Sequence, residues 1–317
     1  MLLALLCLSF SLSFAILIDY SPHADALGCA DLKHVSIGSS LYKTSRKELL
    51  RARLNGSIDV LVERPFDGAS LWTQLNASAR EAAYTDYFRR ERVMMRSLAS
   101  NYVPVFLGGC FTSFEVLLHV TEPLRLLSDV ADDVLVDWRQ RVRIAQNAVR
   151  LVPFLDQLPI GKRAIYGDTW TSHFGVDSQL RVKFLDYQSF FAYETRFGLY
   201  KCEDTPECHE KFFESDTNPK VLLGLRSLAP DDFRCVRGTC NGVDALTQLM
   251  AICKMLIEPL FSDFDLPAEA QAVHAILDAC LQPKRVDRAT PTAVAAALEK
   301  IVPARIVLRP LQIEFTV

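Results

Sequence analysis

Alternating hydrophobic and polar positions in the first part of the chain predict a small sheet with one long helix. Residues 33–66 indicate short strands, and the alternation is clearest in SIDVLVERPF at 57–66. Residues 78–99 predict an amphipathic helix, with Ser78 and Glu81 at the spacing of a capping box. The apolar runs VPVFLGG and FEVLLHV that follow are short enough to be buried strands.

The second part of the chain follows a helical period over most of its length. Two helices are expected at about 123–136 and 137–157. A compact strand pair, HFGVDS and RVKFLDY, comes next, and TAVAAALEKI near residue 297 predicts a late helix. Strands with one helix first and helices afterwards favour an α+β fold with a small sheet lobe and a larger helical lobe.

Composition narrows the class of protein without identifying it. Half of the 317 residues are hydrophobic, 23% are charged, and the formal net charge is −3. Such a chain can bury a large core, which a disordered chain cannot. After residue 18 no apolar run approaches the roughly 18 residues of a membrane-spanning helix. The near-neutral charge argues against nucleic acid as a partner.

The chain begins with an apolar leader. Leu2 to Ile18 is almost uninterrupted, and Ser13-Phe14-Ala15 offers small residues at the −3 and −1 positions of a cleavage site. We therefore expect a signal peptide over residues 1–15 and a protein of the ER or Golgi lumen or the extracellular space. An uncleaved signal anchor, which would attach the chain to a membrane, and a buried core helix are the alternatives.

Eight of the nine cysteines lie beyond the leader, and five of them are clustered. In an oxidising compartment this even number predicts a disulfide framework, whose connectivity cannot be deduced from the spacing. Zinc held by Cys202, Cys208 and His209 is the competing interpretation, although no CxxC pair occurs. Sequons at Asn55 and Asn76 fit glycosylation in the same compartment. The disulfide candidates are Cys29, Cys110, Cys202, Cys208, Cys235, Cys240, Cys253 and Cys280.

Two aspartates, Asp168 and Asp186, lie on either side of the expected strand pair. An aspartate at the end of a buried strand is costly unless it is paired or binds a metal. Phosphoryl transfer uses such a pair: one carboxylate accepts the proton of the nucleophile, and the other holds Mg²⁺ against the phosphates. The alternative is that both are loop aspartates that cap turns.

The order of these elements resembles a protein kinase. DWRQRVRIAQNAVRLVPFLDQLP resembles the helix before a catalytic loop, and YGDTWTSHFGVDSQLRVKFLDYQ resembles that loop, a strand pair and a DFG-type turn. FRRERVMMRSL is similar to the αC helix, and ILDACLQPKRVDRATPTAVAAAL to the last segment of the helical lobe. The resemblance implies a two-lobed fold, with a β-rich N-lobe at 30–120 and a helical C-lobe at 121–317.

One branch of the kinases fits the cysteine-rich segment at 200–253. YKCEDTPECHEKFF, FRCVRGTCNG and LMAICKMLIEPLF resemble the secretory-pathway divergent protein kinase family, also named family-with-sequence-similarity sixty-nine, whose relatives include the deleted-in-autism proteins. Gly-Gly-Cys at 108–110 is similar to the glycine-cysteine turn before the fifth strand of that family. The resemblance implies a disulfide-rich insertion in the C-lobe.

The resemblance also assigns roles to single residues. Asp168 would be the catalytic-loop base, Asp186 the metal ligand, and Glu91 the αC glutamate. His173 stands where the family has an asparagine as second metal ligand, and imidazole suits Mn²⁺ better than Mg²⁺. The glycine-rich loop is reduced to Gly38, and Tyr-Gln follows the metal-binding aspartate in place of Phe-Gly.

The phosphate-contacting lysine of kinases has no counterpart in the expected strand. That strand contains V-L-V-E-R, so Glu63 or, one residue later, Arg64 stands in its place, and the two point to opposite faces. Arg64 in the cleft would neutralise phosphate, whereas Glu63 would repel it. Arg64, Gly38 and Glu91 are therefore the expected cofactor-binding residues.

These motifs leave more than one function open. An active enzyme would use ATP with Mg²⁺ or Mn²⁺ and transfer a phosphoryl group to a hydroxyl of a lumenal or extracellular protein. A pseudokinase, which the lost lysine and asparagine favour, would need no cofactor and would act as a secreted ligand or scaffold. The third interpretation is an ordinary secreted α+β domain whose likeness to kinases is coincidental.

Overall fold

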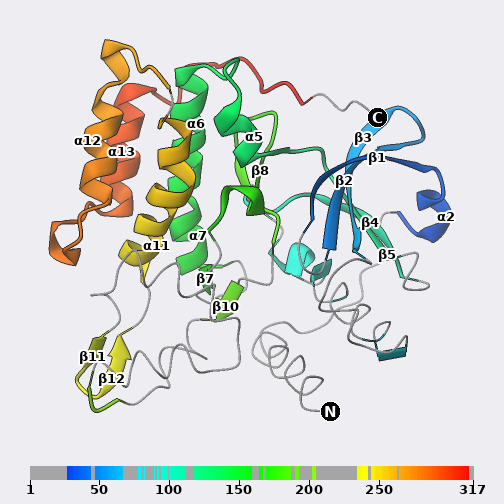
Figure 1. Ribbon diagram of the computed structural model, residues 1–317, viewed down its shortest axis with the longest axis horizontal. Helices are drawn as coiled ribbons and strands as arrows, with labels where there is room; N and C mark the ends of the chain where they lie inside the picture. The colour runs from blue at the N-terminus through cyan, green and yellow to red at the C-terminus, as the bar shows by residue number, and fades with distance from the viewer. Residues whose placement is uncertain are drawn as a thin grey trace. The chain divides into compact units, whose positions relative to one another are not determined.

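The computed structural model describes the folded parts of the chain in two compact units. The described residues of the first fall within Ile18–Leu126 and Gln312–Val317, and those of the second within Leu127–Leu311. Strands dominate the first unit and helices the second, so the expected α+β class is confirmed (Figure 1). No helix among the described residues is long and apolar enough to cross a bilayer. The residues described are 27–43, 47–66, 78–79, 82, 89, 91–92, 94–98, 100–111, 117–158, 164–166, 169–186, 190–192, 202–204, 234–241, 244–262 and 264–313.

The first unit is built on a five-stranded antiparallel sheet with the strand order β1-β2-β3-β5-β4. Asn55 and Gly56, with φ angles of 51° and 71°, turn the chain from β2 into β3. Asn and Gly are the residues that adopt this left-handed conformation at least cost. The strand expected at 57–66 is β3. The bounds are β1 Val35–Lys43, β2 Lys47–Leu54, β3 Ile58–Pro65, β4 Phe106–Phe111, β5 Leu117–Thr121 and the short β6 Arg125–Leu126.

The N-terminal segment covers one face of this sheet. Leu32, at the end of the short helix α2 (Cys29–Leu32), packs into a cluster of buried apolar residues from β2 and β3. Leu27 forms a parallel bridge with Gly108 of β4, and a Cβ atom at Gly108 would overlap the carbonyl oxygen of Leu27. Glycine is therefore required at this close approach of two backbones. The apolar cluster consists of Leu32, Leu50, Ala52, Leu54, Val60, Val62 and Cys110.

The long helix expected at 78–99 is helical at every described residue up to Ser97. Met94, Met95 and Leu98 are buried, as an amphipathic helix against a sheet requires. Glu81 lies outside the described residues, so the capping box is not tested.

The second unit is a group of helices with small β elements. In Figure 1 α6, α11, α12 and α13 lie side by side, and α6 and α12 both contact α13. The bounds are α5 Leu127–Asp132, α6 Trp138–Val149, α7 Leu151–Asp156, β7 Ala164–Tyr166, η2 Thr171–His173, β8 Phe174–Val176, β9 Val182–Phe184, β10 Phe190–Ala192, β11 Arg234–Val236, β12 Thr239–Asn241, α11 Ala245–Ile252, the π-helix η4 Cys253–Ile257, η5 Glu258–Leu260, η6 Ala268–Ala270, α12 Ala272–Cys280, η7 Arg285–Asp287 and α13 Pro291–Ile301.

Two expected helices differ from those observed. The helix at 137–157 is divided into α6 and α7 at Arg150. Pro153 has no N–H to donate to Val149, so the α6 hydrogen-bond ladder cannot continue through it. The helix at 123–136 is reduced to α5, because the Asp133 carboxylate accepts a 2.8 Å hydrogen bond from the Leu135 N–H and forms a turn.

Arg141 stabilises the connection between α5 and α6 from inside. Its side chain is buried, and its guanidinium lies 4.4 Å from the ring of Phe264. Burial lowers the pKa of Arg141, although the charges of Asp133 and Asp132 oppose this shift. The guanidinium donates to four backbone carbonyl oxygens, those of Val136 (3.0 Å), Ala131 (2.8 Å), Asp133 (2.6 Å) and Leu260 (2.8 Å).

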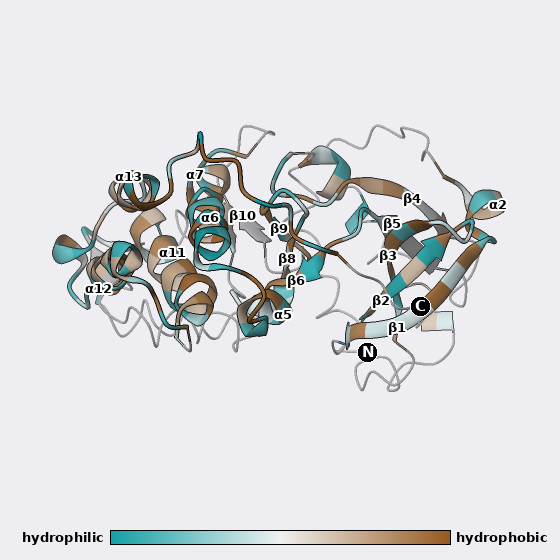
Figure 2. Ribbon diagram, turned by 90° about the horizontal axis from the view of Figure 1, so that it is seen from above, coloured by the Kyte–Doolittle hydropathy of each residue, from teal (hydrophilic) through white to brown (hydrophobic). Residues whose placement is uncertain are grey.

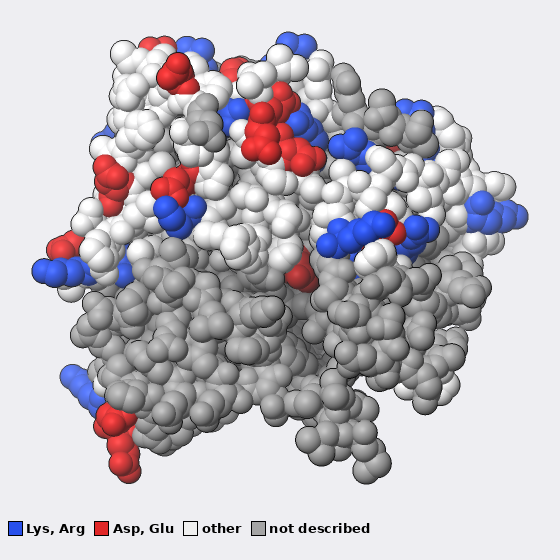
Figure 3. Space-filling view, in the orientation of Figure 1, with Lys and Arg blue, Asp and Glu red and all other residues white. Residues whose placement is uncertain are grey.

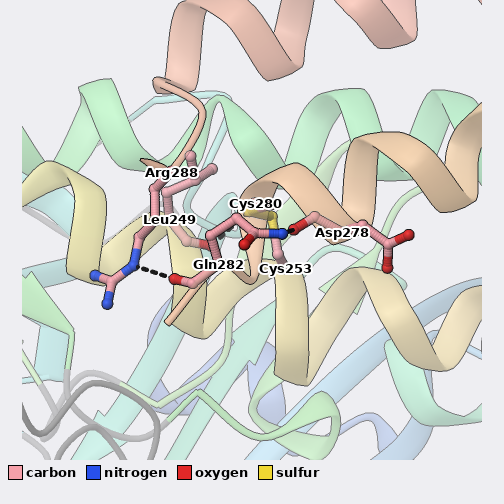
Figure 4. The surroundings of a disulfide bond; sticks show 6 residues. All are labelled: Leu249, Cys253, Asp278, Cys280, Gln282 and Arg288. Atoms are coloured by element: carbon pink, nitrogen blue, oxygen red, sulfur yellow. Dashed lines mark hydrogen bonds between the residues drawn. A yellow bond between two sulfur atoms is a disulfide. The ribbon is translucent and has the colours of Figure 1, made fainter. Parts of the chain in front are cut away.

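Three disulfides confirm the expected framework for six of the cysteines. In Figure 4 the Cys253–Cys280 bond joins the π-helix η4 to the end of α12. Because Cys202 is bonded to Cys235, it is not available for the zinc site considered as an alternative. Cys208 and the side chain of Cys240 lie outside the described part of the chain. The disulfides are Cys29–Cys110, Cys202–Cys235 and Cys253–Cys280.

Candidate functional site

A completely buried lysine lies at the start of β2. Lys47 is 0% exposed, and its Nζ atom donates a 2.8 Å hydrogen bond to Oε1 of Glu91. The same Nζ atom lies 2.9 Å from Oε1 of Glu63. Glu91 comes from the helical positions 91–92 and 94–97, and Glu63 comes from β3, so the three side chains join three parts of the first unit. We call Lys47, Glu63 and Glu91 the Lys47 cluster.

The register of the sheet explains why Lys47 and Glu63 meet. Glu63 of β3 pairs directly with Leu49 of β2, and Lys47 lies two residues before Leu49. Side chains two residues apart on a strand point to the same face, so Lys47 and Glu63 are diagonal neighbours. Hydrophilic and hydrophobic residues are mixed along β2 (Figure 2). Lys47 of β2 and Glu63 of β3 both lie on the face of the odd-numbered residues.

The Lys47 cluster contains a buried cation that was not among the expected site residues. An isolated buried ammonium costs several kcal/mol, so Lys47 is stable in this position only beside carboxylates. Glu91, which the resemblance identifies as the αC glutamate, is 3% exposed and bonded to a lysine of the sheet. Its partner is on β2, while Glu63 occupies the β3 position expected for the lysine.

Arg64 faces the other side of the sheet and has a different partner. Its guanidinium donates to Oε2 of Glu48 at 3.0 and 3.2 Å, and Lys43 lies 3.1 Å from the same carboxylate. Burial would raise the pKa of Glu48, but hydrogen bonds from Lys43, Arg64 and Ser40 and the charge of Arg64 hold it below its ordinary value. Arg64, expected to bind the cofactor, thus lies on the face opposite Glu63 and the Lys47 cluster.

Gly38 lies inside β1 and not in the connection to β2. The pairing of β1 with β2 is irregular between Ile37 and Ser40, which places Gly38 at a bulge. The connection itself, residues 44–46, is outside the described residues.

In the second unit the two metal-ligand candidates come to the same end of a hairpin. β8 and β9 pair antiparallel, with Phe174 opposite Phe184. The Leu185 N–H then donates a 2.8 Å hydrogen bond to the carbonyl oxygen of His173, and Asp186 follows at once. Asp186 is 7% exposed. Its carboxylate and the His173 imidazole are suitable donors for Mn²⁺.

Three aromatic rings fix the backbone around this hairpin. The ring centre of Tyr166 lies 5.3 Å from that of Phe174 and 4.8 Å from that of Phe184, and the two phenylalanines are 5.2 Å apart. Gln248 of α11 holds the same tyrosine in place through two hydrogen bonds, of 3.0 and 2.9 Å, to its backbone N–H and carbonyl. The strands that lead to both candidate aspartates therefore share one rigid support.

The pairing of β7 with β10 places the last residue of β7 and the first residue of β10 at the same end of this strand pair. β7 and β10 pair antiparallel with Tyr166 opposite Phe190. Asp168 follows Tyr166 by two residues, and Asp186 precedes Phe190 by four. Asp168 itself lies outside the described residues, so its geometry is not tested.

The described surface carries charges of both signs and one of the two sequons. On the face drawn in Figure 3 the acidic and basic side chains of the described residues form small mixed groups. No group of three or more His, Cys, Asp or Glu side chains suited to a metal ion occurs among the residues that the structure describes. The sequon residue Asn55 is exposed in its turn, and Asn76 lies outside the described residues.

Comparison with known proteins gives no family for this chain. No protein-family model matches the sequence, and no curated protein matches it. The functional interpretation therefore depends on the Lys47 cluster, on the hairpin that ends at Asp186, and on the motifs in the sequence.

Proposed function

We propose that this chain is a divergent protein-kinase-like protein of the secretory pathway that binds a nucleoside triphosphate with a divalent cation. The Lys47–Glu91 ion pair carries the proposal, because a sheet lysine oriented by a helix glutamate is what kinases use to contact phosphates. The three disulfides support folding in an oxidising compartment.

The proposed activity is transfer of a phosphoryl group from ATP to a hydroxyl of a lumenal or extracellular protein. Lys47 would neutralise phosphate oxygens, and Glu91 would orient Lys47. Asp186 and His173 would hold Mn²⁺ or Mg²⁺, and Asp168 would accept the proton of the hydroxyl. ATP supplies the phosphoryl group, and the metal neutralises charge on the phosphates.

A pseudokinase that acts as a secreted ligand or scaffold is the second candidate. The position of Glu63 favours it, because this carboxylate already contacts Lys47 and would repel phosphate. His173 in place of an asparagine favours it as well, since imidazole is a poor ligand for Mg²⁺.

A thermal-shift titration of the secreted protein with ATP and either Mg²⁺ or Mn²⁺ tests the proposal. A ligand at about 100 times its Kd adds about 2.7 kcal/mol, which should raise the melting temperature by several degrees. Asp186→Asn should lose the metal-dependent part of the shift, and Lys47→Met the whole shift. Lys43→Met, which alters a half-exposed lysine on β1, is the matched control and should keep it.

Each outcome of this titration has a clear meaning. A shift in the native protein that disappears in Lys47→Met supports a nucleotide site and justifies an assay of phosphate transfer to secreted proteins. No shift with either metal would contradict nucleotide binding and favour the ligand or scaffold.

A further inference from the structure

The two carboxylates of the Lys47 cluster are held differently. Glu91 accepts a hydrogen bond from Lys47, whereas Oε1 of Glu63, 2.9 Å from Nζ, has no hydrogen bond within the described residues. Glu63 is 7% exposed, so this oxygen is removed from water. A buried oxygen with only an ionic contact is held less firmly than a hydrogen-bonded one and is the easier of the two to displace.

The cluster also has an excess of negative charge. Two carboxylates and one ammonium sum to −1 when all three are ionised. Arg64, the next residue after Glu63, does not offset this charge, because it faces the opposite side of the sheet and is bonded to Glu48. A phosphate that approached Lys47 would therefore meet the charge of Glu63 at close range.

We infer that Glu63 is an internal substitute for a nucleotide phosphate: its carboxylate occupies Lys47 when no nucleotide is bound and weakens nucleotide binding through its charge. This inference rests on the proposed function, since the ligand is a nucleoside triphosphate with its cation. Glu63 acts here as a positioning residue that sets affinity.

The test is the Kd of ATP with Mn²⁺, measured by calorimetry on the disulfide-bonded protein. Glu63→Gln keeps the size of the side chain and removes the charge, and it should bind at least about tenfold more tightly. Glu91→Gln should bind more weakly, because Lys47 loses its orienting partner. Glu48→Gln is the matched control, since Glu48 is a buried carboxylate on the opposite face, and its Kd should equal that of the native chain.

The outcomes separate this inference from the proposed function. Equal or weaker binding by Glu63→Gln, with binding by the native chain, overturns the inference and leaves the proposed function intact. Binding by Glu63→Gln alone supports the inference and identifies a site that is blocked by its own carboxylate. No binding by either protein overturns both.

A double variant and a stability measurement complete the test. Lys47→Met/Glu63→Gln should lose the gain in affinity, and retained tight binding would overturn the inference, because the phosphates would then not use Lys47. Thermal unfolding of Glu63→Gln and of the native chain, both without nucleotide, shows whether the gain in affinity comes only from a better folded variant.

Discussion

Lys47 donates a 2.8 Å hydrogen bond to Glu91, which lies 44 residues later in the chain, and the two side chains are 0% and 4% exposed. The bond connects the first residue of β2 to the helical positions around Glu91 in the same unit. A buried ion pair contributes little net stability compared with an apolar pair of the same volume. The pair therefore adds little stability by itself, although removal of one partner alone would leave the other charge buried and unpaired.

Loss of Lys47 should strongly destabilise the protein. Lys47→Met leaves Glu63 and Glu91 buried without their cation, and removal of one partner of a buried ion pair typically costs about 3–5 kcal/mol. Urea unfolding under non-reducing conditions measures this loss. The control Lys43→Met removes a half-exposed charge and should cost less than about 1 kcal/mol. Equal losses in the two variants would contradict the burial of Lys47.

Much of the fold follows from the pattern of the sequence. The alternation at 57–66 predicts β3, and the apolar runs at 103–109 and 114–120 overlap β4 and β5. The pair β8 and β9 is also predicted, as a compact strand pair. These elements are predictable because each is a short, mostly apolar segment that is visible within the element itself, and β8 and β9 are buried at every position.

The Lys47 cluster could not be predicted in the same way. Lys47 and Glu48 are consecutive charges at the start of a strand, a pattern typical of a solvated strand end. The Asn55–Gly56 turn fixes the register of β2 and β3 and would have placed Lys47 beside Glu63 on one face. The approach of Glu91 depends on the packing of a distant helix, which no local pattern contains.

Gly108 should be sensitive to the smallest substitution. In Gly108→Ala the new Cβ would overlap the Leu27 carbonyl oxygen and lie 2.5 Å from Leu27 Cβ, so the covering segment must move. Overpacking of this kind typically costs about 1–3 kcal/mol, measured here by thermal unfolding. Gly28→Ala is the control: the nearest atom to its Cβ is 3.9 Å away, and the loss should stay below about 1 kcal/mol. Native stability in Gly108→Ala would show that the segment is not held against β4.

Arg141 should be the most sensitive arginine of the second unit. Arg141→Met leaves four carbonyl oxygens without their donor, and each buried unsatisfied group costs about 1–3 kcal/mol. Arg141→Lys should rescue little, because a single ammonium cannot reach four acceptors in a fork. Hydrogen exchange of residues 131–136 and thermal unfolding report the loss. In the control Arg139→Met a half-exposed charge 4.0 Å from Glu269 is removed, and a comparable loss there would contradict the role of Arg141.

The ion pairs of Glu48 should make stability depend on pH in the acid range. Its pKa in the folded protein is lower than the ordinary value of 4.5, so the ionised form is favoured by folding. The resulting stabilisation is present above the unfolded pKa and is lost as the pH falls through the lower folded pKa. The difference in unfolding free energy between the native protein and Glu48→Gln should therefore shrink as the pH falls from neutral through and below the ordinary value of 4.5. Because Lys43 and Arg64 are about half exposed, added salt should reduce the same difference at neutral pH. A difference that changes with neither pH nor salt would mean that the Glu48 charge does not contribute to folding.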